Sequence, residues 1–261
     1  MNLIVKNSIE KISIIGSGNV AWHLSTNFVK IGIKVTHIFG RNTIDVHSLC
    51  KKVNAIHSKS IKDLPKNQLV IICTPDDAIS NICKSIDSSC PIAYTSGSVE
   101  IQSLPYREKI GVIYPLQTFS KNIKIKLNKV PFFIESTNNL LQKQLYNLTL
   151  KISNNVKIID SIQRKKIHLA AVFVNNFTNH IIYQAQNYAK TNSINFKDLM
   201  PLLEETFNKI NIESAFKSQT GPARRGDNNI IKQHIEILKG NSKEIYMLLS
   251  KSIKDTYNEK L

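Results

Sequence analysis

The chain has 261 residues, of which 42% are hydrophobic, and a formal net charge of +16 at pH 7. This length allows one large domain or two modest ones, and two is the better starting point. The lysines that carry the charge are scattered along the whole chain, whereas nucleic-acid binding needs a localised basic face, so we expect no nucleic-acid partner.

The cysteines and the apolar runs narrow the class of protein further. Cys50, Cys73, Cys83 and Cys90 form no CxxC pair, so the sequence indicates neither a metal site nor a disulfide framework. The strongest apolar run in the second half, at 169–174, is too short to cross a membrane. We therefore expect reduced thiols and a cytoplasmic protein with no metal and no membrane partner.

Short apolar runs alternate with longer helical patterns over residues 11–160, which is typical of βαβ units and a parallel sheet. Strands are predicted at 11–16 and 34–39, with a helix over 19–31 between them. A helix is expected after Pro75, whose fixed φ suits a first helical turn. Further strands are predicted at 68–73, 91–96, 111–115, 130–135 and 156–160.

The pattern then changes, because apolar residues fall three and four positions apart and no strand-like run recurs. Helices are predicted over 161–190, 198–210 and 227–240, followed by a last helix that closes the chain. The expected fold is α/β. A Rossmann-type, doubly wound, mostly parallel sheet occupies residues 1–160, and an all-helical domain occupies residues 161–261.

The segment IIGSGNVAWHL, which follows the first strand, fits the GxGxxG/A pattern with Gly16, Gly18 and Ala21 in the three key places. The first glycine permits a tight turn, the second lets the backbone approach a pyrophosphate, and the alanine allows close packing of helix on strand. The pyrophosphate then lies on a helix N-terminus, where unpaired N–H groups favour negative charge. The predicted dinucleotide turn comprises Gly16, Ser17, Gly18, Asn19, Val20 and Ala21.

The end of the second strand indicates which dinucleotide is bound. An enzyme that uses NAD usually has an Asp or Glu there for the ribose 2′-hydroxyl, whereas an Arg accommodates the 2′-phosphate of NADP. This chain has Arg41 in that region, with Asn42 and Thr43 after it. The sequence therefore favours NADP(H), and a solvated arginine in a turn stays open as the alternative.

Polar residues follow two strands at the carboxyl edge of the predicted sheet, where ligands of open α/β sheets bind. Thr74 and Pro75 follow one strand, and Ser96, Gly97 and Ser98 follow another. We expect these residues to line the nicotinamide edge of the cofactor.

The predicted helix over 161–190 carries a second group of candidate residues. Asn175 and Asn179 follow His168 by 7 and 11 residues, which places all three on one helix face at 3.6 residues per turn. Ala171 and Val172 lie between them and are small enough to leave a cleft.

Six segments resemble a family of bacterial Rossmann-like proteins that have a helical C-terminal domain of unknown function and are described as predicted NADP oxidoreductases. The architecture is also similar to the group that contains β-hydroxyacid dehydrogenases, ketopantoate reductase and pyrroline-5-carboxylate reductase. The similarity to this group implies an interlocked homodimer with the active site between domains, so that the helical domain serves both substrate binding and dimerisation. The segments are GSGNVAWHL, CTPDDAI, YTSGS, YPLQTF, HLAAVFVNNF and QTGPARRGD.

The chain departs from the β-hydroxyacid dehydrogenases at one position. Those enzymes have a catalytic Lys four residues before an Asn on the long helix, but here Ala171 and Val172 stand four before Asn175 and Asn176. His168 is the candidate replacement, because an imidazole titrates near neutral pH and can donate a proton as hydride arrives. A partly buried His bonded to a backbone carbonyl is the structural alternative.

Two arginines in the QTGPARRGD segment are candidates for binding an anion. Arg224 and Arg225 precede a predicted helix, and a guanidinium group binds a carboxylate or phosphate in a bidentate way. Pairing with acidic residues at a dimer interface is the alternative for both.

The sequence as a whole predicts an NADPH-dependent reductase of a small anionic carbonyl or imine compound. His168 donates the proton, Asn175 orients the reacting group, and Asn179, Arg224 and Arg225 bind the substrate. A non-catalytic NADP-binding sensor or regulatory protein is the rival, and the absent helix lysine supports it.

Overall fold

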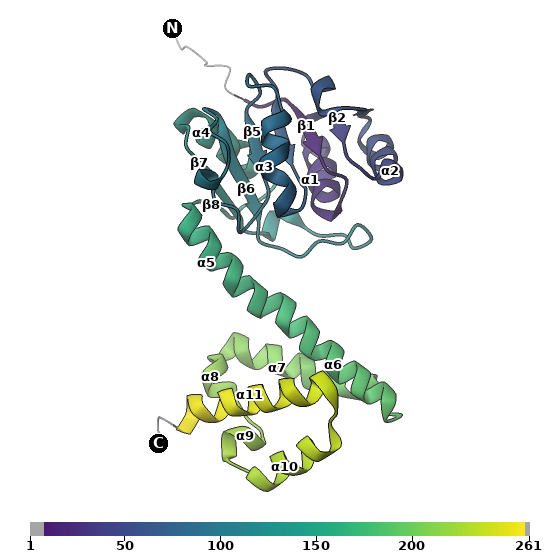
Figure 1. The fold of residues 1–261 in the computed structure, drawn as a ribbon, viewed down its shortest axis with the longest axis vertical. Helices are drawn as coiled ribbons and strands as arrows, with labels where there is room; N and C mark the ends of the chain where they lie inside the picture. The colour runs from purple at the N-terminus through teal and green to yellow at the C-terminus, as the bar shows by residue number, and fades with distance from the viewer. Residues whose placement is uncertain (1–7, 259–261) are drawn as a thin grey trace. The chain divides into compact units, whose positions relative to one another are not determined.

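A computed structural model describes residues 8–258 and contains an eight-stranded sheet with the strand order β3-β2-β1-β4-β5-β6-β7-β8 (Figure 1). Neighbouring strands pair in parallel except β6 and β7, which are antiparallel. The expected Rossmann-type, mostly parallel sheet is thus confirmed. The strands are β1 Lys11–Ile15, β2 Lys34–Phe39, β3 Ile56–His57, β4 Leu69–Ile72, β5 Ile92–Tyr94, β6 Ile110–Pro115, β7 Phe132–Ser136 and β8 Val156–Ile158.

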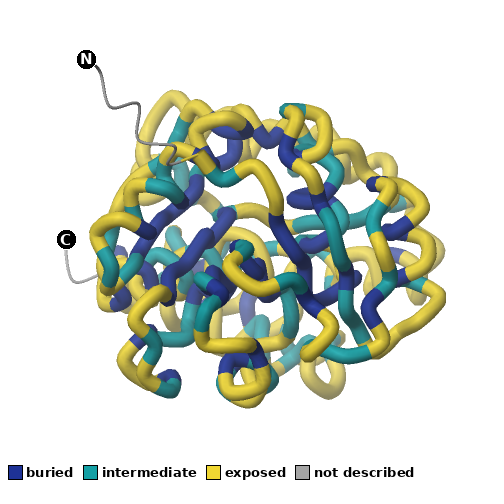
Figure 2. Tube along the Cα trace, turned by 90° about the horizontal axis from the view of Figure 1, so that it is seen from above, coloured by how far each residue is buried: buried dark blue, intermediate teal, exposed yellow. Residues whose placement is uncertain are grey.

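Helices cover both faces of this sheet. The first face packs against α1 (Asn19–Lys30), α2 (Thr43–Val53) and α4 (Asn139–Leu150), and the second packs against α3 (Asp76–Ser85). Strand β4 explains why both faces need cover, because all four of its side chains are apolar and buried, and successive side chains point to opposite faces. Figure 2 shows the buried strands in dark blue. Short 3-10 helices lie in the connections at Ile61–Asp63, Ile101–Ser103 and Leu127–Lys129.

The chain divides into two compact units, residues 1–176 and 177–261. The last strand ends at Ile158, and the first unit also includes the helix α5 (Ser161–Ala171). Every element of the second unit in the described part of the chain is helical, as predicted. These elements are α6 Thr178–Thr191, a 3-10 helix at Phe196–Leu199, α7 Met200–Ile212, α8 Ala215–Ser218, α9 Pro222–Arg225, α10 Asn228–Ile237 and α11 Gly240–Asn258.

Two helix predictions differ in detail from the structure. The long helix predicted over 161–190 contains a π-helical turn, Val172–Phe177, whose hydrogen bonds span one residue more than those of an α-helix. The helix predicted to end at Gly240 ends at Ile237, and Gly240, with φ of +54°, begins α11 instead. This glycine is therefore the first residue of a helix rather than the residue that follows the end of one.

A fully buried arginine joins three separate parts of the first unit. The Arg164 guanidinium of α5 donates to the Glu135 carboxylate of β7, with the shorter nitrogen–oxygen distance 2.8 Å. The same group donates to the Ser96 carbonyl at 3.0 Å and the Val99 carbonyl at 2.7 Å. It also bonds the Ser161 hydroxyl at 3.0 Å, which in turn donates to Glu135 at 2.7 Å.

These bonds satisfy a buried charge whose desolvation would otherwise be costly. They fix the start of α5 against the end of the sheet and against the loop that follows β5. His168 lies one helical turn beyond Arg164, so the same contacts determine where the imidazole is held.

We expect Arg164→Met to lower the free energy of unfolding by about 3–5 kcal/mol, because Glu135 would remain buried without a counter-charge. Urea denaturation of the full chain measures this change. The matched control is Lys165→Met, which removes the exposed ion pair with Glu100 and should cost about 0–1 kcal/mol. Equal losses in the two variants would contradict a special role for Arg164.

Candidate functional site

The turn between β1 and α1 is shaped by its two glycines. Gly16 has φ of +114°, and a Cβ there would lie 2.2 Å from the Cys73 carbonyl oxygen, so the position requires glycine. Gly18 is the N-cap of α1, and a Cβ built on it meets no atom within 4 Å. Ala21 is fully buried against the core. The turn therefore leaves open space in front of a helix N-terminus, as a bound pyrophosphate needs.

Arg41 is exposed at the carboxyl end of β2, beside this turn. The preceding Gly40 lies close to the glycine turn, since a Cβ on it would be 3.4 Å from the Ser17 hydroxyl. Asn42 caps α2 by accepting from the Asp45 backbone N–H. Arg41 thus directly precedes the N-cap of α2, at the same edge of the sheet as the glycine turn.

Sequence reasoning missed a cation that reaches this region from far along the chain. The ammonium group of Lys121 pairs with the Asp45 carboxylate of α2 at 2.7 Å. The backbone N–H of Lys121 donates to the Asn19 side chain of α1 at 3.2 Å. His23 Nε2 lies 2.8 Å from the Ser120 carbonyl oxygen. These contacts tie the loop after β6 to the N-terminal parts of α1 and α2. A single lysine 76 positions away from its partner carries no local sequence signal.

The predicted nicotinamide edge contains an ordered loop and an unpartnered hydroxyl group. The Ser96 hydroxyl accepts from the Ser98 and Val99 N–H groups, and the Ser98 hydroxyl donates to Asp76 at 2.6 Å. Thr74 Oγ1 is buried and has no hydrogen-bond partner among the described residues. A buried polar atom in this state is satisfied when a ligand supplies the missing group. The open space at Gly18 and the unpartnered hydroxyl of Thr74 are the two features of this edge that suit a dinucleotide.

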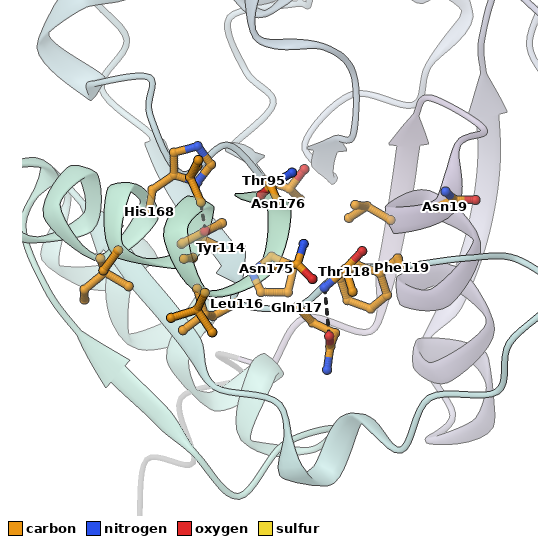
Figure 3. A pocket seen from close by; sticks show the side chains of 17 residues that line it. Asn19, Thr95, Tyr114, Leu116, Gln117, Thr118, Phe119, His168, Asn175 and Asn176 are labelled. Atoms are coloured by element: carbon orange, nitrogen blue, oxygen red, sulfur yellow. Dashed lines mark hydrogen bonds between the residues drawn. The ribbon is translucent and has the colours of Figure 1, made fainter. Parts of the chain in front are cut away.

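A cavity of about 780 Å³ lies within the first unit, between the end of β6, the start of α1 and the helix that carries His168 (Figure 3). This volume is in the range of small-molecule sites. No lining residue is an Asp, Glu, Lys or Arg, so the described wall of the cavity carries no fixed charge. The lining residues are Asn19, Val20, Thr95, Tyr114, Pro115, Leu116, Gln117, Thr118, Phe119, Ile167, His168, Ala170, Ala171, Val172, Val174, Asn175 and Asn176.

Two ring side chains meet in the wall of this cavity. The Tyr114 hydroxyl of β6 lies 3.1 Å from His168 Nδ1 of α5, and the rings are edge to face (Figure 3). Gly97 makes this contact possible, because a Cβ there would lie 2.6 Å from His168 Nδ1. Burial raises the pKa of the Tyr114 hydroxyl, an effect that the positive charge of Arg164 opposes. The tyrosine therefore keeps its proton at neutral pH.

The cavity brings together some of the predicted catalytic and substrate residues and not others. His168 and Asn175 both line it, and the structure adds Asn176, which was not among the predicted site residues. The π-helical turn accounts for this addition, because it widens the turn that carries both asparagines. Asn179 belongs to the second unit and is not among the lining residues.

The two predicted anion-binding arginines also belong to the second unit. Arg225 pairs with Asp227 at 2.8 Å, and the Arg224 guanidinium lies 4.4 Å from the centre of the Tyr257 ring. Arg225 thus already has a carboxylate partner within its own unit, whereas Arg224 has none among the described ion pairs. Arg224 is the better of the two candidates for a ligand anion.

The remaining candidate chemistries find no support in residues 8–258. All four cysteines are unpaired, and burial raises the pKa of Cys73 to about 12, which keeps its thiol protonated. No cluster of three or more metal-ligating side chains occurs in this part of the chain. Within the same residues, no helix combines the length and apolar character needed to cross a membrane.

Comparison with protein families gives two matches. Residues 11–91 match the family described as NADP oxidoreductase coenzyme F420-dependent, and residues 130–253 match a domain of unknown function, DUF2520. No curated protein sequence matches the chain. The two matched segments cover the dinucleotide turn and most of the helical part.

Comparison with solved structures identifies similar folds over almost the whole chain. A candidate NADP oxidoreductase from Bacteroides fragilis is 31% identical, with a TM-score of 0.86 over 96% of this chain and 100% of that one. A reductive aminase from Aspergillus terreus, in complex with NADPH and ethyl-5-oxohexanoate, is 13% identical, with a TM-score of 0.69 over 97% and 95% of the two chains. An imine reductase from Myxococcus stipitatus, in complex with NADP+, is 12% identical, with a TM-score of 0.66 over 95% and 93%.

Proposed function

The chain belongs to the family of NADP oxidoreductases in which a Rossmann domain precedes the DUF2520 domain, and we propose that it is a reductase of a small carbonyl or imine compound. The observation that carries the proposal is the uncharged cavity of about 780 Å³ at the carboxyl edge of the sheet. It extends from Thr95, which directly precedes the predicted nicotinamide residues Ser96, Gly97 and Ser98, to the one imidazole in its described wall, His168.

The cofactor we propose is NADP(H), bound by the residues that the sequence singles out. Gly16, Ser17, Gly18, Asn19, Val20 and Ala21 would hold the pyrophosphate, and Arg41 the 2′-phosphate. Thr74, Pro75, Ser96, Gly97 and Ser98 would border the nicotinamide, whose amide group would give the Thr74 hydroxyl the partner that it lacks among the described residues. When bound, the reduced nicotinamide supplies the hydride.

The chain itself contributes a proton and the orientation of the substrate. We assign the proton to His168 Nε2, since Nδ1 faces Tyr114 and no described hydrogen bond uses Nε2. Asn175, also in the cavity wall, would orient the carbonyl or imine group through its amide. We also propose Arg224, Arg225 and Asn179 as ligands of an anionic group, since no residue in the described cavity wall carries a fixed positive charge.

We also propose that the protein is a homodimer, because the second unit buries too little apolar surface for its size. Its buried hydrophobic residues in the described part are Ala189, Ala223, Ile231 and Tyr257. A unit of this length normally needs a continuous core. Large hydrophobic residues of the same unit are exposed instead, among them Ile181, Leu202, Phe207, Ile210, Ile212, Ile237, Met247 and Leu248.

A second copy of the chain is the partner that this exposed surface favours, since symmetric homo-oligomers are the commonest assemblies. Sedimentation equilibrium should therefore give twice the 29.5 kDa mass of one chain. Leu202→Glu should shift the mass towards one chain, because Leu202 is 68% exposed in the single chain and a carboxylate there would be buried in the dimer. Tyr106→Glu, at an exposed position of the first unit, is the control and should leave the mass unchanged.

The choice of cofactor has its own test. Arg41→Asp should weaken NADPH binding by about 10- to 100-fold and spare NADH, because the 2′-phosphate would lose a charged hydrogen-bond donor and meet a like charge. Lys109→Asp makes the same change in net charge at the start of β6, on the opposite edge of the sheet, and should leave both affinities unchanged. Fluorescence titration measures the affinities of the wild-type protein and both variants for NADPH and NADH. An Arg41→Asp variant that keeps its preference for NADPH would show that another residue holds the phosphate.

The reaction is tested by following NADPH absorbance with panels of ketones, 2-keto acids, 3-keto acids and imines. We expect turnover of at least one class, and a loss of about 100-fold or more in kcat for His168→Asn on a substrate that needs a proton. The absence of Lys at Ala171 and Val172 keeps an NADP-binding sensor as the rival. Tight NADPH binding without turnover of any panel member would favour the sensor over the reductase.

A further inference from the structure

The cavity wall contains two titratable side chains among the described residues, and they touch each other. These are His168 and Tyr114, whose Nδ1 and hydroxyl oxygen lie 3.1 Å apart. The tyrosine is nearly buried, at 8% exposure, and within residues 8–258 His168 is the hydrogen-bond partner of its hydroxyl. A phenol hydroxyl is a good donor, and an unprotonated imidazole nitrogen is a good acceptor. This contact is suited to donation from the Tyr114 hydroxyl to Nδ1.

We propose that Tyr114 is the proton source of the reductase and that His168 relays this proton to the substrate, an inference that rests on the proposed function. With Tyr114 donating to Nδ1, neutral His168 carries its own proton on Nε2. No hydrogen bond among the described residues uses that nitrogen, so it is left to donate to a substrate.

The relay balances for reduction of a carbonyl. As hydride reaches the carbonyl carbon, the π electron pair moves to oxygen, which forms a bond to the proton of Nε2. The Nε2–H bond breaks, and Nδ1 takes the proton from the Tyr114 hydroxyl. To reset the pair, Nε2 takes a proton from water and Nδ1 returns its proton to the tyrosinate, which restores the Tyr114 hydroxyl and the Nε2–H form of His168. The carbonyl is reduced and the reduced nicotinamide is oxidised. An alkoxide is much more basic than a tyrosinate, so the transfer is downhill even though burial disfavours the anion.

Of the two charged side chains that act on the Tyr114 hydroxyl, the positive one has the larger effect and favours a transient tyrosinate. Arg164, which is buried beside the Ser96–Val99 loop, acts on Tyr114 as a positive charge, whereas Asp76 acts in the opposite sense and is the lesser influence. Glu135 pairs with Arg164 and holds it in place. The arginine that fixes the start of α5 thus also supports the chemistry one turn further along the helix.

The chemistry of the substrate distinguishes this relay from a merely structural contact. A ketone needs a proton when hydride arrives, whereas a preformed N-alkyl iminium ion becomes a neutral amine without one. We therefore expect Tyr114→Phe to lower kcat for a ketone about 100-fold, which is the lower range for general acid catalysis, and to leave kcat for an iminium ion within about twofold. Tyr106→Phe, at 93% exposure, is the matched control and should change neither. Equal losses on both substrates would overturn the relay.

The arrangement is also testable without any substrate, with the full chain labelled with nitrogen-15 histidine and loaded with NADP+. One of the seven histidines is assigned to His168 by its loss in His168→Asn. In the wild-type protein its Nδ1 should be unprotonated and shifted by the Tyr114 hydrogen bond, and Tyr114→Phe should abolish that shift. Tyr114→Phe keeps the ring and its packing on Phe133, so folding is preserved.

A second variant reaches the same contact from the other side. Gly97→Ala places a Cβ 2.6 Å from Nδ1 and should displace the imidazole, with the same loss of the nitrogen shift. A protonated Nδ1 in the wild type, or a resonance that Tyr114→Phe leaves in place, would overturn the proposal. If no ketone or iminium ion is turned over, the proposed function fails, and the nitrogen-15 spectra still decide whether Tyr114 donates to His168.

Discussion

The buried pair of Arg164 and Glu135 is the constraint on which the rest of the site depends. An arginine with no solvent exposure must find partners for its donors inside the protein, and here they come from a strand, a loop and its own helix. Because Glu135 is part of β7 and the two carbonyl partners belong to the loop after β5, the first turn of α5 has a single position relative to the sheet and to that loop. The imidazole of His168 then meets Tyr114 without further adjustment.

The parts of this structure that could be predicted from the sequence are those that local patterns encode. Apolar runs identified the strands, the spacing Gly16, Gly18, Ala21 identified the dinucleotide turn, and the change of periodicity identified the helical part. Each of these signals lies within one element and its neighbours, where a short stretch of chain is sufficient to determine the backbone.

The rest depends on contacts between residues far apart in the sequence. Nothing near Arg164 indicates that Glu135 is its partner, and nothing near Asp45 points to Lys121. The pairing of Tyr114 with His168 joins β6 to α5 through the space left by Gly97, which the sequence shows only as part of a loop. No sequence pattern reliably predicts a π-helical turn. The sequence therefore did not indicate that Asn176 lines the cavity together with Asn175.

The wall of the cavity carries no fixed charge, and this has a consequence for selectivity in a cell. Many small metabolites carry phosphate or carboxylate groups. Moving such a group to the His168 end of this cavity, away from the helix N-terminus at Asn19 and Val20, removes its water without replacing it. Metabolites that carry such a group near the reacting end would therefore be excluded by the free energy of dehydrating it, and not by the lack of a specific hydrogen bond to the protein. A substrate that enters must present a neutral reacting end, and any charge that it bears must be far enough from that end to remain outside.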